Sequence, residues 1–115
     1  MAEKITNIDE YQNLAQRTNN STDFQRDLLN GALGLNGEAG EVADIIKKWQ
    51  FQGHAINPDK IAEELSDICW YIAIMAKALN YDFSEILYIN IEKLKIRYPK
   101  GFDAELSRKR YESQK

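Results

Sequence analysis

Residues 57–79 read NPDKIAEELSDICWYIAIMAKAL, and this stretch decides the fold class. It combines a clear helix start with a long run that contains no helix-breaking residue. Asn57 is a good N-cap residue, Pro58 suits the first helical position, and acidic residues follow in the first turns. Because Lys77 is the one charged residue in 68–79, a helix here is apolar on every side. We therefore predict a helix that is buried around most of its circumference.

The rest of the chain shows the same helical periodicity. Its 115 residues include only two prolines, and apolar residues recur at spacings of three and four without sustained alternation. We predict three further helices, over about 7–17, 23–51 and 82–97. Four glycines at three-residue spacing in the second of these predict a kink, a break or the close approach of another element. The predicted fold is all-α and similar to a four-helix bundle, followed by a charged tail at 103–115 that forms a short helix or frays.

Composition excludes several function classes. With 15 Lys and Arg against 18 Asp and Glu, the formal net charge is −3, which argues against general binding to nucleic acid or to anionic membranes. A single cysteine, Cys69, excludes an internal disulfide, and we expect it to be an inert core residue. The single histidine, His54, excludes a His-rich metal site and is expected in a surface loop. Without an apolar run of about 18 residues or a signal-peptide layout, we expect a soluble cytoplasmic protein.

The apolar run at 68–79 also bears on assembly. Three neighbouring helices in a chain of this length scarcely cover a helix that is apolar all round. Two interpretations follow: a central core helix in a monomer, or a subunit interface in an obligate oligomer. We favour the oligomer, with Trp70 in the interface or the core.

Two pairs of carboxylates suggest a metal site. Glu38 and Glu41 are three residues apart in one predicted helix, and Glu64 and Asp67 are three apart in the next, so each pair shares a helix face. If these two helices pack antiparallel, the four carboxylates converge and repel by on the order of several kcal/mol without a cation. Oxygen ligands favour Mg²⁺, with Mn²⁺ as a substitute. The alternative is a solvated acidic face.

A row of polar and basic residues lies on the last predicted helix. Asn90, Lys93 and Arg97 stand at i, i+3 and i+7, so they share a face. An amide and two cations in a row suit phosphate oxygens, which a nearby metal would also contact. The alternative is that these side chains are simply solvated.

Taken together, these motifs resemble the MazG family of all-α nucleoside triphosphate pyrophosphohydrolases. The resemblance rests on Glu-x-x-Glu, 22 intervening residues and Glu-x-x-Asp, within GEAGEV at 37–42 and EELSDI at 63–68. It continues in NIEKLKIRYPKGF at 90–102. Since it covers most of 8–102, it implies one domain over 1–115 with its core at about 8–102.

The resemblance also implies a reaction and the residues that perform it. Members of the family hydrolyse a nucleoside triphosphate between the α and β phosphates, releasing the monophosphate and pyrophosphate. The implied metal ligands are Glu38, Glu41, Glu64 and Asp67, and the implied phosphate contacts are Asn90, Lys93 and Arg97. We expect Glu38 to be the general base, with Glu41 or Glu63 as alternatives.

The nucleoside pocket and the assembly are less closely defined by the resemblance. The candidates for the pocket are Gln12, Trp49 and Tyr71, although Trp49 is equally suited to a core position. Single-domain members of the family are homodimers or pairs of dimers, which implies the same for this chain. Two other classes of function remain open: a nucleotide- or metal-binding oligomer without catalysis, and a purely structural helical oligomer.

Overall fold

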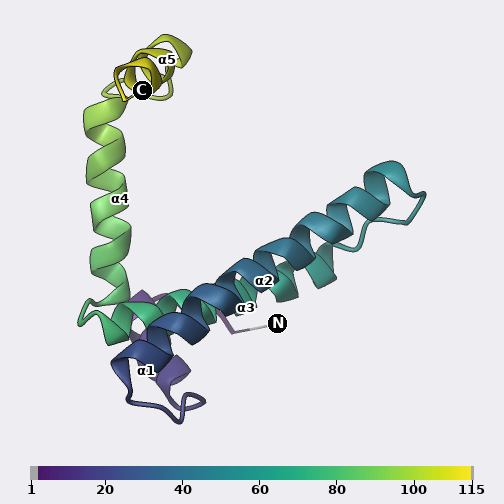
Figure 1. The fold of residues 1–115 in the computed structure, drawn as a ribbon, viewed down its shortest axis with the longest axis vertical. Coiled ribbons are helices and arrows are strands. Elements are labelled where there is room, and N and C mark those ends of the chain that lie inside the picture. Colours follow the sequence, from purple (N-terminus) through teal and green to yellow (C-terminus); the bar gives the residue numbers. More distant parts are fainter. Residues whose placement is uncertain (1–2, 115) are drawn as a thin grey trace. The chain divides into compact units, whose positions relative to one another are not determined.

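The computed structural model describes residues 3–114, which form five helices and no strand. The helices are α1 (Ile8–Gln16), α2 (Phe24–Phe51), α3 (Pro58–Ala78), α4 (Phe83–Arg97) and α5 (Ala104–Ser113) (Figure 1). The all-α prediction is confirmed, and the charged tail forms the fifth helix. The chain divides into two compact units, residues 1–83 with α1 to α3 and residues 84–115 with nearly all of α4 and with α5.

Side-chain caps begin the helices where the sequence places cap-forming residues. The Asn57 side chain accepts a hydrogen bond from the backbone N–H of Lys60 at 3.1 Å, and Pro58 is the first residue of α3. At the other end of that helix, Asn80 adopts the left-handed conformation with φ of 63°. Asparagine tolerates this conformation, so α3 ends close to the predicted position.

In the first unit, α2 and α3 lie side by side and antiparallel, and α1 packs against α3 (Figure 1). α2 runs unbroken through its four glycines, two of which permit the close approach of α3. A Cβ at Gly31 would collide with the side chain of Met75, and one at Gly34 with the ring of Tyr71. Of the three predicted roles for these glycines, close approach is the one that the structure shows at Gly31 and Gly34.

The core of the first unit forms around α3. Ala15, Ala73 and Phe83 make a buried cluster, against which Trp70 and Ile72 pack. Ile74 and Ala76 are also buried, so much of the apolar run at 68–79 is covered within a single chain. The core interpretation therefore holds for these residues.

The prediction that Cys69 is a core residue is wrong, because Cys69 is exposed. A hollow of about 260 Å³ lies beside it, lined also by Ile5, Ile8, Tyr11 and Ser66. Since this hollow between the start of α1 and α3 is open, the thiol reaches solvent.

In residues 3–114, no helix has both the length and the apolar character needed to cross a membrane.

Candidate metal centre

The antiparallel packing of α2 and α3 brings three of the four predicted carboxylates together. Glu38 of α2 and Glu64 and Asp67 of α3 each offer one carboxylate oxygen, and these oxygens lie within 4.8 Å of one another. Octahedral Mg²⁺ with bonds of about 2.1 Å separates its ligand oxygens by roughly 3 to 4.2 Å. Small side-chain movements would therefore let the three oxygens surround one cation.

Glu41 lies outside this cluster of three carboxylates. Its side chain is exposed, whereas Glu64 is buried and Glu38 is half-buried. A step of three residues along an α-helix leaves a residue rotated by roughly 60° and displaced by about 4.5 Å. Glu41 therefore shares the general face of Glu38 without reaching the same point, although its charge still contributes to raising the pKa of Glu38.

Glu38 and Glu64 perturb each other's pKa in opposite directions. A hydrogen bond from Glu38 to Glu64, then burial, then the charges of Glu64, Asp67 and Glu41, raise the pKa of Glu38 to about 7. The same hydrogen bond, together with Lys60, lowers the pKa of Glu64. The Oε2 atom of Glu38 is nevertheless buried without a hydrogen-bond partner. A divalent cation fits this site, because it would compete with the proton that the raised pKa of Glu38 favours and would offset the negative charge of the carboxylates.

Lys60 is the nearest compensating charge, and the sequence interpretation overlooked it. Its Nζ lies 3.1 Å from Oε1 of Glu64 and 3.8 Å from Oε1 of Glu63. The hydrogen bond to Glu64, with the charges of Glu63 and Glu64, raises the pKa of Lys60. The sequence contained the information needed to predict this ion pair, since Lys60 and Glu64 stand at i and i+4 on one predicted helix.

Gln12, a candidate for the nucleoside pocket, is held in the core of the first unit. Its Nε2 donates to the backbone oxygens of Tyr81 at 3.0 Å and Ala73 at 3.4 Å. Its Oε1 accepts from the backbone N–H of Phe83 at 2.9 Å. These bonds link α1 to α3, to the loop that follows it and to the first residue of α4. The Gln12 amide therefore stabilises the packing of the first unit.

The aromatic candidates lie on α2 and α3. Trp49 is 42% exposed, and Tyr71 is half-buried with its ring against Gly34. The Tyr71 ring also meets Trp70 edge-on at a centroid distance of 5.2 Å. The indole N–H of Trp70 donates to Thr18 Oγ1 at 2.8 Å and to the backbone oxygen of Ala15 at 3.2 Å, so Trp70 is anchored to the end of α1.

The three candidate phosphate-binding residues all lie on α4, in the second unit. Asn90 and Lys93 are exposed, and Arg97 is half-buried near the end of the helix. On the same helix, Lys95 forms an ion pair with Glu92, with 3.2 Å between Nζ of Lys95 and Oε1 of Glu92. Because the side chains of Asn90 and Lys93 are exposed, a ligand can reach them.

The family assignment follows from comparison with known proteins. Residues 27–102, well over half of the chain, match the family model described as the MazG nucleotide pyrophosphohydrolase domain. The chain belongs to this family. The predicted resemblance is thereby confirmed, and members of the family are nucleoside triphosphate pyrophosphohydrolases, a class of hydrolase.

The gene 37 protein of Mycobacterium phage L5 is 36% identical to the chain over 73 residues. That alignment covers 60% of this chain and 64% of the phage protein, so the chain spans less than two thirds of that relative. No solved structure matches the chain.

Proposed function

We propose that this chain hydrolyses a nucleoside or deoxynucleoside triphosphate between the α and β phosphates, releasing the monophosphate and pyrophosphate. The observation that carries the proposal is the convergence of Glu38, Glu64 and Asp67, from two helices, in a member of the MazG family. Removal of unwanted nucleotides from the pool is the cellular role that this reaction best suits.

The metal is proposed to be Mg²⁺, with Mn²⁺ as a substitute, since hard oxygen ligands suit both ions. Glu38, Glu64 and Asp67 would hold it, with Glu41 as the fourth carboxylate at the edge of the cluster. When bound, such a cation supplies positive charge against the phosphate oxygens and orients a water for in-line attack.

Glu38 is the proposed general base. Its Oε2 is buried without a hydrogen-bond partner, so this oxygen retains an unused acceptor within the cluster. Such an oxygen can accept the proton of an attacking water when the other oxygen is engaged. Glu41 is the alternative base, because it lies one turn away with an exposed carboxylate.

We also propose roles for the other candidate residues, in keeping with membership of the family. Asn90, Lys93 and Arg97 are proposed to contact the phosphates, and Trp49 and Tyr71 to contact the nucleoside. We place these roles in one functional domain, with its core at residues 8–102, that acts in the cytoplasm as a homodimer or homotetramer without nucleic acid.

A substrate panel tests the proposal. Purified chain is incubated with natural and modified nucleoside triphosphates, with Mg²⁺ or with chelator, and both pyrophosphate and orthophosphate are measured. We expect pyrophosphate and monophosphate, and only with Mg²⁺. Orthophosphate as the sole inorganic product would contradict cleavage at the α–β bond. No turnover, combined with a rise in melting temperature caused by Mg²⁺, would favour a binding protein without catalysis.

A further inference from the structure

A polar hollow in the first unit is built from parts of all three of its helices. It measures about 270 Å³, and the end of α1, the loop after it, the start of α2 and the end of α3 supply its walls. A hollow of this size lies just below the range of roughly 300–1,000 Å³ that is typical of sites for drug-sized ligands, so it suits a single ring system. Its lining includes Gln16, Ser21, Thr22, Phe24, Asp27 and Lys77.

Asp27 is the carboxylate of this hollow, and the fold leaves it with little compensation. The residue is only 8% exposed. Its side chain accepts a hydrogen bond from Asn19 Nδ2 at 3.4 Å, which is longer than the usual range of about 2.7–3.2 Å. Within residues 3–114, no basic side chain lies within ion-pair distance of Asp27, although Lys77 lines the same hollow. Because a buried carboxylate is costly without donors or a cation, a ligand that supplies donors would bind favourably here.

Gln16 and Lys77 add unused donors to the same hollow. The Nε2 atom of Gln16 is buried and has no hydrogen-bond partner. Lys77 is exposed and forms no ion pair within the part of the chain that the structure describes. Since buried polar groups in folded proteins are nearly always hydrogen-bonded, the free amide also points to a missing partner. One acceptor group and two donor groups thus line one small space.

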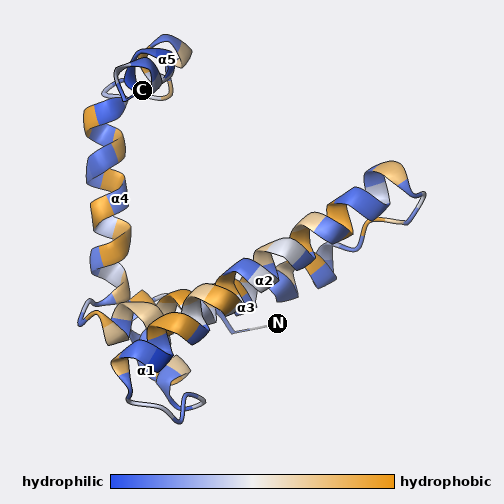
Figure 2. Cartoon of the chain, viewed as in Figure 1, coloured by the Kyte–Doolittle hydropathy of each residue, from blue (hydrophilic) through white to orange (hydrophobic). Residues whose placement is uncertain are grey.

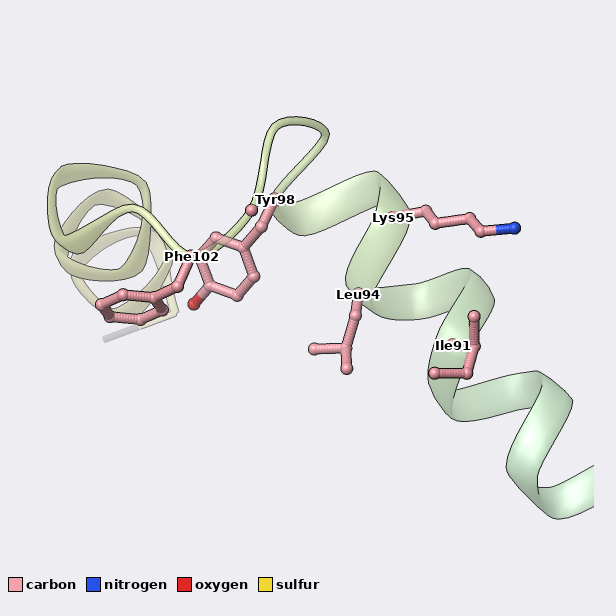
Figure 3. A pocket seen from close by; sticks show the side chains of 6 residues that line it. Ile91, Leu94, Lys95, Tyr98 and Phe102 are labelled. Carbon is pink, nitrogen blue, oxygen red and sulfur yellow. The ribbon is translucent and has the colours of Figure 1, made fainter.

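A hollow of about 370 Å³ in the second unit differs in this respect (Figure 3). Apolar and aromatic side chains line most of it, among them Tyr98 and Phe102. Its charged residue, Lys95, extends away from these two rings in Figure 3 and pairs with Glu92 at 3.2 Å. The charge in that hollow is therefore balanced within the chain, whereas the charge of Asp27 is not.

We propose that the polar hollow of the first unit is a second ligand site, which binds a guanine ring. A carboxylate offers two acceptor oxygens and no donor. Guanine presents two adjacent donors, its ring N1–H and its exocyclic amine, beside the O6 acceptor. The two donors would pair with Asp27, and O6 would accept from Gln16 or Lys77. Phe24 supplies an aromatic face on which a base can stack.

The other common bases suit this arrangement less well. On the corresponding edge, adenine, cytosine and uracil each place an acceptor next to their donor. That acceptor would face one oxygen of the Asp27 carboxylate, and the two sets of lone pairs would repel each other. The choice of guanine therefore rests on the carboxylate, and the amide of Gln16 adds the complementary donor.

The polar hollow and the proposed metal centre lie on one face of α2 but apart from each other. Asp27 and Glu38 are 11 residues apart, which is about three helical turns and roughly 16 Å along the helix. Between them, the side chains of Met75 and Tyr71 pack against glycines of α2. The guanine site is therefore independent of the proposed function, and we expect it to bind its ligand without metal.

The test measures binding of guanosine to the full chain in chelator, by isothermal titration calorimetry. Inosine differs from guanosine only in lacking the exocyclic amine, so it should bind about tenfold more weakly, as expected for the loss of a hydrogen bond to a charged group. Adenosine and cytidine should bind no better than inosine. This comparison uses the wild type alone, so it does not depend on the stability of any variant.

Three variants locate the binding site. Asp27→Asn should abolish the preference for guanosine over inosine, because it exchanges one acceptor oxygen for a donor. Gln16→Leu should weaken both nucleosides alike, since both carry O6. Asp44→Asn is the matched control, because Asp44 is a carboxylate of α2 that pairs with Lys48 at 2.8 Å, and it should bind guanosine as the wild type does.

The outcomes separate this site from the metal centre. Equal affinities for guanosine and inosine, tighter binding of another nucleoside or no binding of guanosine would overturn the proposal. Loss of guanosine binding in Asp67→Asn would also overturn it, because the ring would then occupy the metal centre. Guanosine binding that depends on Asp27, in a chain without turnover, would support this site and contradict the proposed function instead.

Discussion

At the scale of single residues, the site depends on how four charges share a small space. Glu38 and Glu64 are joined by a hydrogen bond that requires a proton, and Asp67 adds a third carboxylate oxygen within 4.8 Å. Lys60 balances part of this charge from the side of Glu64. The Oε2 atom of Glu38 still lacks a partner. The raised pKa of Glu38 means that protonation offsets part of the charge that we propose a divalent cation to offset.

The metal-free protein should lose thermal stability as the pH rises from about 5 to about 7.5. The pKa of Glu38 is raised from its ordinary 4.5 to about 7 in the folded chain, so protonation favours the fold. This stability is complete below the ordinary pKa and is lost as the pH passes 7. The pKa of Glu64 is lowered, so its own contribution is lost only in more acidic solution.

Melting temperatures in chelator across this pH range measure the effect. Glu38→Gln keeps an N–H donor toward Glu64 and should hold the melting temperature nearly level. Saturating Mg²⁺ should remove the decline in the wild type, because the metal competes with the proton. An equal slope for wild type and Glu38→Gln in chelator would contradict the shared proton.

At the scale of helices, the four glycines of α2 form two pairs: α3 packs against the first pair, and no side chain packs against the second. Gly31 and Gly34 face Met75 and Tyr71 of α3, whereas nothing lies within 4 Å of a Cβ built at Gly37 or Gly40. The sequence was sufficient to place the helices, since caps such as Asn57 and Asp23 act locally. It could not choose among a kink, a break and close approach for the glycines, because that depends on side chains of another helix.

Two matched glycine substitutions test this division of α2. Gly34→Ala should destabilise the fold by about 1–3 kcal/mol, because the new methyl group would collide with the Tyr71 ring. Gly37→Ala should stabilise it by about 0.5–1 kcal/mol, since alanine favours the helix and the position is open. Urea unfolding of both variants gives the free energies. Equal changes in the two variants would show that α3 does not approach α2 at Gly34.

At the scale of the whole molecule, apolar side chains remain exposed in both units. On α2, Leu29 is 62% exposed and Leu33 is 66% exposed, and on α4 Ile96 is 81% exposed. Hydrophobic residues recur along both helices (Figure 2). Of the two interpretations of 68–79, a core helix or a subunit interface, the core describes Ala73, Ile74 and Ala76, which are buried within one chain. Hydrophobic periodicity identifies an apolar face, but it does not say whether the same chain or a second copy covers it.

Self-association is therefore predicted to use the exposed face of α2. The wild type should elute as a dimer or tetramer in size-exclusion chromatography with light scattering. The double variant Leu29→Glu with Leu33→Glu should dissociate while keeping its helical circular dichroism, because both side chains are exposed. Gln25→Glu with Asn36→Asp adds the same charge at exposed polar positions of α2 and should leave the assembly intact. A monomeric wild type would contradict the prediction.

The measurement that tests the central claim most directly is a titration of Mn²⁺ into the metal-free full chain, followed by the electron paramagnetic resonance signal of free Mn²⁺. We predict a site that Mg²⁺ competes for and that Asp67→Asn or Glu64→Gln weakens by about tenfold or more. Asp44→Asn is the control, since Asp44 lies on α2 and pairs with Lys48 at 2.8 Å instead of joining the cluster. It should bind Mn²⁺ as the wild type does. Equal affinity in Asp67→Asn and wild type, or equal losses in Asp67→Asn and Asp44→Asn, would contradict a metal site at Glu38, Glu64 and Asp67.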